Sequence, residues 1–128
     1  MLCSPQNPTG RVWIKEELTR IGEICLKHHV IVLSDEIHCY FIYSGNIHTV
    51  FASISEEFAM NSIICTAPSK TFNIAGLHIS NIFIPNRTLR HAFREEFDAS
   101  GYSQLNSLGL VACQSVCLLK GRSMVKRT

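Results

Sequence analysis

A short apolar run at residues 30–34 constrains the fold of this chain more than any other feature. The run reads Val-Ile-Val-Leu-Ser, and it follows residues 14–28, in which apolar side chains recur at helical spacing. That spacing predicts an amphipathic helix, and the short β-branched run after it predicts a strand buried on both faces of a parallel sheet. A second run of this kind spans residues 62–66, after a loop at 44–61 for which we expect one helical turn. Helices that alternate with buried strands indicate an α/β fold.

The rest of the chain extends the same pattern. Residues 78–84 alternate moderately and predict a third strand, while residues 87–98 carry apolar side chains four apart and predict a helix capped by Asn86. Residues 105–116 predict a last helix, and the proline-rich opening at residues 4–10 predicts a turn. Three strands are few for a doubly wound sheet, and the chain starts inside a turn. We therefore expect part of a larger domain, from which a preceding strand is missing.

Composition narrows the possible classes of function. The chain has 128 residues, 46% of them hydrophobic and 17% charged, which is typical of a single globular domain with a core. The formal net charge of +2 is too small to predict binding to nucleic acid or to an anionic membrane, and no apolar run reaches the roughly 20 residues of a membrane span. None of the six cysteines forms a Cys-x-x-Cys pair, so we expect reduced thiols in a cytoplasmic protein.

The residues directly after the first predicted strand raise the question of function. Asp35, Glu36 and His38 place two acids and an imidazole at the end of that strand. One interpretation is a nucleic-acid ATPase, in which an Asp-Glu-x-His motif holds magnesium, but it requires a glycine-rich phosphate loop upstream. The only candidate loop, residues 65–71, lies downstream and contains no glycine. Its Pro68 also lacks the backbone N–H that such a loop uses to bind phosphate.

A metal site is a second interpretation of the same residues. Asp35 and His38 could be ligands, with His48 or His78 joining them. However, the sequence contains neither a His-Glu-x-x-His motif nor a cluster of cysteine and histidine at metal-ligand spacing. The pattern therefore favours this interpretation only weakly.

The third interpretation joins Asp35 to Lys70 and Asn7. Asp35 and Lys70 both follow predicted buried strands, at the edge where open α/β sheets bind ligands, and Asn7 lies in a turn that could reach the same crevice. A lysine amine forms a Schiff base with the aldehyde of pyridoxal phosphate, and an aspartate keeps the pyridinium nitrogen protonated. The protonated ring then withdraws electrons from the substrate Cα, and an asparagine amide can donate to the phenolate oxygen. These three residue types together predict a pyridoxal-phosphate site.

Three blocks of sequence carry a resemblance to a known family. They read Ser-Pro-Gln-Asn-Pro-Thr-Gly-Arg-Val-Trp at residues 4–13, Ser-Asp-Glu-Ile-His at 34–38 and Ala-Pro-Ser-Lys-Thr-Phe-Asn-Ile-Ala-Gly-Leu at 67–77. In this order and at this spacing, the chain resembles the fold-type I pyridoxal-phosphate enzymes of the class I/II aminotransferase superfamily. The resemblance covers residues 1–114 and implies a partial cofactor-binding large domain with a mostly parallel sheet. Residues 115–128 do not resemble the family and form a divergent basic tail.

The resemblance implies a role for each matching residue. Lys70 corresponds to the Schiff-base lysine, which also moves the substrate proton. Asp35 corresponds to the partner of the pyridinium nitrogen, and Asn7 to the contact with the phenolate oxygen. His38 corresponds to a contact at the ring edge. Tyr43 is a weaker candidate for the same site, as is His48.

The wording of the blocks is most similar to the cystathionine β-lyase subgroup, the bacterial carbon–sulfur β-lyases. Many aminotransferases of the superfamily have tyrosine at the position of His38 and a phosphate-binding arginine at the position of His78. Many relatives also have serine where this chain has Ala67, so Thr66 or Ser69 is expected to contact the cofactor phosphate instead.

The implied reaction is β-elimination from cystathionine or a cysteine conjugate, which gives a thiol, pyruvate and ammonia. Transamination by a class I/II aminotransferase is the alternative, because both reactions use the same residues. A non-catalytic remnant that keeps the lysine but cannot hold the cofactor is a further alternative of another class. The family also implies a small amino-acid substrate and a homodimeric parent protein.

Overall fold

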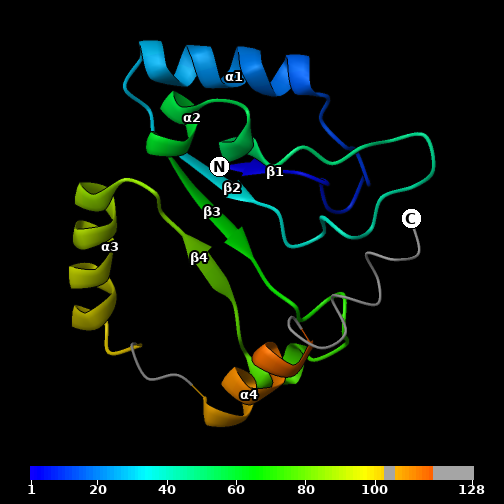
Figure 1. The fold of residues 1–128 in the computed structure, drawn as a ribbon, viewed down its shortest axis with the longest axis vertical. Coiled ribbons are helices and arrows are strands. Elements are labelled where there is room, and N and C mark those ends of the chain that lie inside the picture. Colours follow the sequence, from blue (N-terminus) through cyan, green and yellow to red (C-terminus); the bar gives the residue numbers. More distant parts are fainter. Residues whose placement is uncertain (103–105, 117–128) are drawn as a thin grey trace.

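The computed structural model describes residues 1–102 and 106–116. Its strands form one sheet in the order β1 (Leu2–Cys3), β2 (Val32–Asp35), β3 (Ser62–Thr66) and β4 (Asn81–Phe83). β1, β2 and β3 are parallel, and β4 runs antiparallel to β3 (Figure 1). Because helices flank this mostly parallel sheet, the predicted α/β class is confirmed. The predicted opening turn was incomplete, since the residues before it pair with β2 as a further strand.

The helical segments are α1 (Lys15–Lys27), η1 (Phe51–Ser53), α2 (Glu56–Met60), η2 (Ala75–Leu77), α3 (Arg87–Ala99) and α4 (Ser107–Ser115). The predicted helices at 14–28 and 87–98 are confirmed, whereas the loop at 44–61 holds two helical segments rather than one turn. The strand predicted at 78–84 is shorter and spans Asn81–Phe83, because the C-cap of η2, His78, has a left-handed φ of 49°. Of the predicted tail at 115–128, the residues after Val116 lie outside the described part of the chain.

Helix α1 begins without a polar side chain at its N-cap, which is Ile14. The backbone N–H of Ile14 instead donates to Oε2 of Glu17 at 3.2 Å, which is one half of a capping box. Oε1 of Glu17 also accepts from Arg11 at 2.7 Å, so the turn before the helix is tied to its first turn. The acidic side chain near the N-terminus additionally complements the helix dipole.

The hydrophobic core lies on one face of the sheet. Leu18 of α1 and the ring of Phe58 of α2 pack with the strand residues Val32 and Ile64, all of them buried. Along β2 and β3, buried residues alternate with half-exposed ones. The prediction that these strands are buried on both faces is therefore wrong for the described residues. The reason is that α1, η1 and α2 cover one face, whereas α3 contributes no buried residue to the other.

Helices α1 and α2 meet at a glycine. A Cβ added to Gly22 would lie 2.5 Å from ring atoms of Phe58, which is buried. We expect Gly22→Ala to lower the free energy of unfolding by about 1–3 kcal/mol, because the Phe58 ring must move within a packed core. Urea unfolding of the purified variant measures this loss. Gly76→Ala is the matched control, since no atom lies within 4 Å of its added Cβ, and equal losses at the two positions would refute the packing argument.

Candidate functional site

The predicted site residues follow the C-terminal ends of three adjacent parallel strands. Asn7 lies in the turn after β1, Asp35 ends β2, and Lys70 lies in the turn after β3. Parallel strands bring such residues to one edge of a sheet, where α/β folds bind ligands. The short β1 is therefore what carries the Asn7 turn to the side of Asp35.

Asp35 is half-buried on the more open face of the sheet. It pairs in register with Cys3 of β1 and Cys65 of β3, and register partners point to the same face. Its Oδ1 accepts the N–H of Ile37 at 3.1 Å, and its carbonyl oxygen accepts the N–H of Ser4 at 3.0 Å. Among residues 1–102 and 106–116, no other hydrogen bond reaches this carboxylate, so Oδ2 is available to a ligand.

Lys70 is exposed in the turn that follows β3. Two backbone bonds shape this turn, from the N–H of Phe72 to the Pro68 carbonyl at 2.9 Å and from the N–H of Ile74 to the Ser69 carbonyl at 3.0 Å. Within the described part of the chain, no hydrogen bond or ion pair involves the Lys70 amine. A lysine without an internal partner is free to react with a carbonyl group.

Next to Lys70, the turn also contains polar groups that face inward. Ser69 is buried, at 9% exposure. The hydroxyl oxygen of Thr71 is buried and has no hydrogen-bond partner among the described residues. A buried hydroxyl without a partner is costly, so this one fits the edge of a site that takes a polar ligand.

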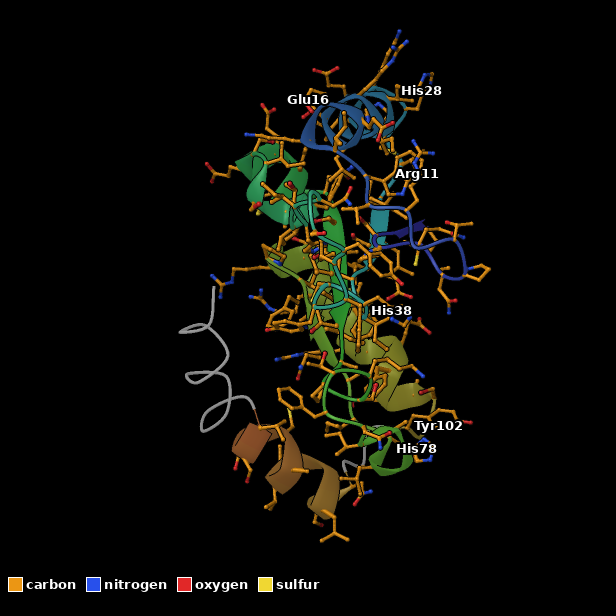
Figure 2. All side chains as sticks on the ribbon, turned by 90° about the vertical axis from the view of Figure 1, so that its right-hand side faces the viewer. Arg11, Glu16, His28, His38, His78 and Tyr102 are labelled. Carbon is orange, nitrogen blue, oxygen red and sulfur yellow. The ribbon has the colours of Figure 1, made fainter. Side chains whose placement is uncertain are left out.

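Asn7 and His38 are brought together at a shallow hollow of about 140 Å³, which Phe41 and Tyr43 also line. The ring of His38 (Figure 2) meets that of Phe41 edge-on, with centroids 6.1 Å apart. The Tyr43 ring lies against the turn that carries Asn7, since a Cβ on Gly10 would be 3.7 Å from it. No hydrogen bond among the described residues joins Asn7 or His38 to Lys70.

Asp35 and Glu36 do not form an acid pair. Successive residues of a strand point to opposite faces, so Asp35 faces the open side while Glu36 points into the packed side and is only 2% exposed. Glu36 is fully bonded there, to Ser34, His48 and the backbone of Phe51. The period-two pattern of the strand could have revealed this division, which the sequence-based interpretation missed.

The histidines proposed for a metal site are not assembled. His48 is bonded to Glu36, and His78 lies far from His38 in Figure 2. No group of three metal-ligating side chains occurs within the ranges 1–102 and 106–116.

A mainly apolar pocket of about 490 Å³ does not coincide with the predicted site. It lies on the packed face of the sheet, where Ile64, Phe72 and Phe83 give it mainly apolar walls. Its lining does not include Asn7, Asp35, His38, Ser69 or Lys70, but it does include Thr66, the alternative candidate for the phosphate contact. Its one carboxylate, that of Glu36, is already bonded, so we locate the chemistry at the strand ends and not in this pocket.

Two thiols have a raised pKa because of their surroundings. Burial, and secondly the negative charge of Asp35, raises the pKa of Cys65 above its ordinary value of 9.0. Burial, and secondly Glu36, raises the pKa of Cys39 in the same way. Both thiols are therefore neutral near pH 7 and are poor nucleophiles there.

These shifts predict how stability depends on pH. A group with a higher pKa in the folded state stabilises the fold fully below its unfolded pKa, and this contribution is lost as the pH rises through the folded value. We expect the free energy of unfolding to fall above about pH 9, and to fall less in the Cys39→Ala/Cys65→Ala double variant. Urea titrations between pH 7 and 10 measure it; the same decline in both proteins would exclude the thiols as its cause.

Comparison with known proteins decides the family. The family model described as aminotransferase class I and II matches residues 1–114. The chain belongs to this family. It is 48% identical over 115 residues to the cystathionine β-lyase PatB of Bacillus subtilis, a match that covers 90% of this chain. It is 37% identical over 79 residues, or 62% of the chain, to an aspartate aminotransferase of the same organism.

A solved structure supports the same relationship. Cystalysin from Treponema denticola, whose crystal structure contains a pyridoxal 5′-phosphate cofactor, has a TM-score of 0.90 and 46% sequence identity to this chain and covers 98% of it. The chain spans 30% of the length of PatB, 20% of that of the aspartate aminotransferase and 32% of that of cystalysin. This aminotransferase-family chain therefore corresponds to about a third of its lyase relatives. None of its helices within the described ranges is long and apolar enough to cross a membrane.

Proposed function

We propose that this chain carries part of the active site of a pyridoxal-phosphate-dependent carbon–sulfur β-lyase. The substrate is cystathionine or a cysteine conjugate, and the products are a thiol, pyruvate and ammonia. The observation that carries the proposal is the single sheet edge at which the Asn7 turn, the carboxylate of Asp35 and the unbonded amine of Lys70 follow adjacent strands. The extent of the similarity to PatB supports the choice of reaction.

The residues at this edge fit the cofactor chemically. The free amine of Lys70 suits its aldehyde, and the unbonded Oδ2 of Asp35 suits its pyridinium nitrogen. The amide of Asn7 suits the phenolate oxygen, with His38 at the ring edge beside it. Ser69 is the candidate for a phosphate contact. When bound, pyridoxal phosphate supplies an electron sink that eases loss of the substrate Cα proton.

The chain's own residues then have distinct tasks. Lys70 would hold the cofactor covalently through its amine, and the same amine, once free, would take the proton from the substrate Cα. The carboxylate of Asp35 would face the ring nitrogen and would favour its protonated form. In β-elimination, loss of that proton is followed by departure of the thiolate from Cβ, and water releases pyruvate and ammonia.

Transamination is the second candidate, because aspartate aminotransferases also match the chain. Lys70 would then return the proton to the cofactor, and no thiolate would leave from Cβ of the substrate. We favour the lyase because PatB matches more of the chain at higher identity than the aminotransferase does. A third candidate is a remnant without catalysis, which the chain's 30% share of PatB's length keeps open.

Three further assignments belong to the same proposal. Residues 1–114 form part of the cofactor-binding large domain, and the divergent residues 115–128 lie outside it. The complete protein is a homodimer located in the cytoplasm. Its substrate is a small amino acid. The protein binds neither nucleic acid nor a membrane.

Product analysis of the purified chain, loaded with pyridoxal phosphate, tests the proposed reaction. A lyase releases pyruvate and thiol from cystathionine without any added keto acid. An aminotransferase instead converts an added keto acid into its amino acid and releases no thiol. Cofactor binding without either product would favour the remnant and refute the lyase for this chain.

A further inference from the structure

A buried pair of side chains closes the loop that carries His38 and Tyr43. Glu36 stands at the start of this loop and His48 at its end, with side-chain exposures of 2% and 10%. Nε2 of His48 lies 3.0 Å from Oε2 of Glu36. The residues from 39 to 47 are largely exposed, so this buried pair fixes the two ends of an otherwise solvated loop.

Glu36 is itself held firmly to the core. Its Oε1 accepts from the hydroxyl of Ser34 and from the backbone N–H of Phe51, each at 3.0 Å, and both partners are at most 1% exposed. Its own N–H donates to the carbonyl of Cys65 at 2.8 Å, which continues the pairing of β2 with β3. A carboxylate with this many partners is well satisfied in a buried position. His48 is therefore bonded to a rigid anchor.

The loop has few other constraints. The N–H of Cys39 donates to the Glu36 carbonyl, that of Phe41 to the His38 carbonyl, and that of Asn46 to the Tyr43 carbonyl. All of these bonds are local. In the described residues, no other hydrogen bond ties the segment 37–47 to a distant part of the chain. Two side-chain bonds of Glu36 span this segment, one to His48 and one to the N–H of Phe51. The bond to His48 is the one that lies directly at the end of the loop.

We propose that Glu36 and His48 are positioning residues for the cofactor site. Their bond keeps His38 and Tyr43 against the Asn7 turn, where all three line one hollow. This inference rests on the proposed function, because it treats the hollow as the edge of the pyridoxal-phosphate site. Neither Glu36 nor His48 touches the cofactor in this proposal, and the predicted contact of His48 with the site becomes an indirect one.

Two substitutions of His48 test the inference. Glutamine places an N–H donor close to where Nε2 stands, whereas leucine fills space without a donor. We expect His48→Leu to weaken pyridoxal-phosphate binding about tenfold, and His48→Gln to stay within about threefold of the wild type. His91→Leu is the matched control, because His91 pairs with Glu95 at 3.2 Å on an exposed helix face.

Amide hydrogen exchange gives a second measurement that needs no cofactor. In His48→Leu, the amides of Ile37, Cys39 and Phe41 should exchange about tenfold faster, while the amides of β3 keep their wild-type protection. If β3 also loses protection in His48→Leu, Glu36→Gln is the milder variant to use in its place. The glutamine keeps an oxygen that accepts from Ser34 and Phe51. The local acceleration must then appear in Glu36→Gln.

Each outcome decides a separate point. The positioning role would be overturned if His48→Leu bound the cofactor as tightly as His48→Gln does. Unchanged amide exchange at residues 37–41 in His48→Leu would overturn it as well. A wild-type chain that never binds pyridoxal phosphate would refute the proposed function, and the exchange data would still decide whether the pair holds the loop. Equal losses in His48→Leu and His91→Leu would also overturn the inference.

Discussion

Lys70→Ala is expected to abolish covalent binding of pyridoxal phosphate to this chain. The wild-type amine has no internal partner in the described structure and stands in an exposed turn beside the end of β3, so it is free to condense with the cofactor aldehyde. The visible absorbance that the cofactor gains on condensing with a lysine should be present in the wild type and absent in the variant. Any turnover should fall by about 10²–10⁴-fold, since the same amine moves the Cα proton.

Lys15→Ala is the matched control for this experiment, because Lys15 is another exposed lysine, at the start of α1. Its loss should leave the absorbance unchanged. Absorbance that survives in Lys70→Ala but disappears in Lys15→Ala would show that the cofactor reacts with surface lysines and not at the strand ends. Reduction with borohydride followed by peptide mapping would identify the modified lysine directly.

Asp35→Asn is expected to keep the covalent attachment but to weaken retention of the cofactor by about 10- to 100-fold. A hydrogen bond to a charged group contributes about 1.5–3 kcal/mol, and asparagine removes the charge that holds the proton on the ring nitrogen. The variant still offers an oxygen to the N–H of Ile37, so the turn after β2 is preserved. Equilibrium dialysis of the loaded protein measures the loss of cofactor.

Asp98→Asn is the control, because Asp98 lies exposed in α3, outside the strand-end edge. Its cofactor retention should equal that of the wild type. If Asp35→Asn also retains the cofactor as the wild type does, Asp35 does not face the ring. In that case the edge carries only the lysine contact, and the assignment of Asn7 beside it loses its basis.

The main elements of the fold could be predicted because their signals are local. The strand at 62–66 and the helix capped by Asn86 both appear where the sequence predicts them. In the helix case the signal is chemical, since Oδ1 of Asn86 accepts the N–H groups of Thr88 and Leu89. Placement of Asp35 and Lys70 at strand ends followed from the same local patterns.

What could not be predicted depends on contacts between distant residues. The first strand has only two residues, too few for any periodicity, and it exists because β2 offers it a parallel partner. One face of the sheet is half-exposed because α3 buries no residue against it. The spacing of apolar residues within α3 predicts a helix but does not specify where that helix packs. The bond between Glu36 and His48 joins residues on either side of a loop, so neither residue alone predicts it.

The protonation state of the cofactor's ring nitrogen is the most direct test of whether Lys70 and Asp35 bind one pyridoxal phosphate. Nitrogen-15 NMR of the chain loaded with cofactor labelled at that nitrogen measures it at neutral pH. We predict a protonated nitrogen in the wild type and an unprotonated one in Asp35→Asn, with covalent attachment to Lys70 in both. An unprotonated nitrogen in the wild type, or an identical signal in the two proteins, would contradict the shared site.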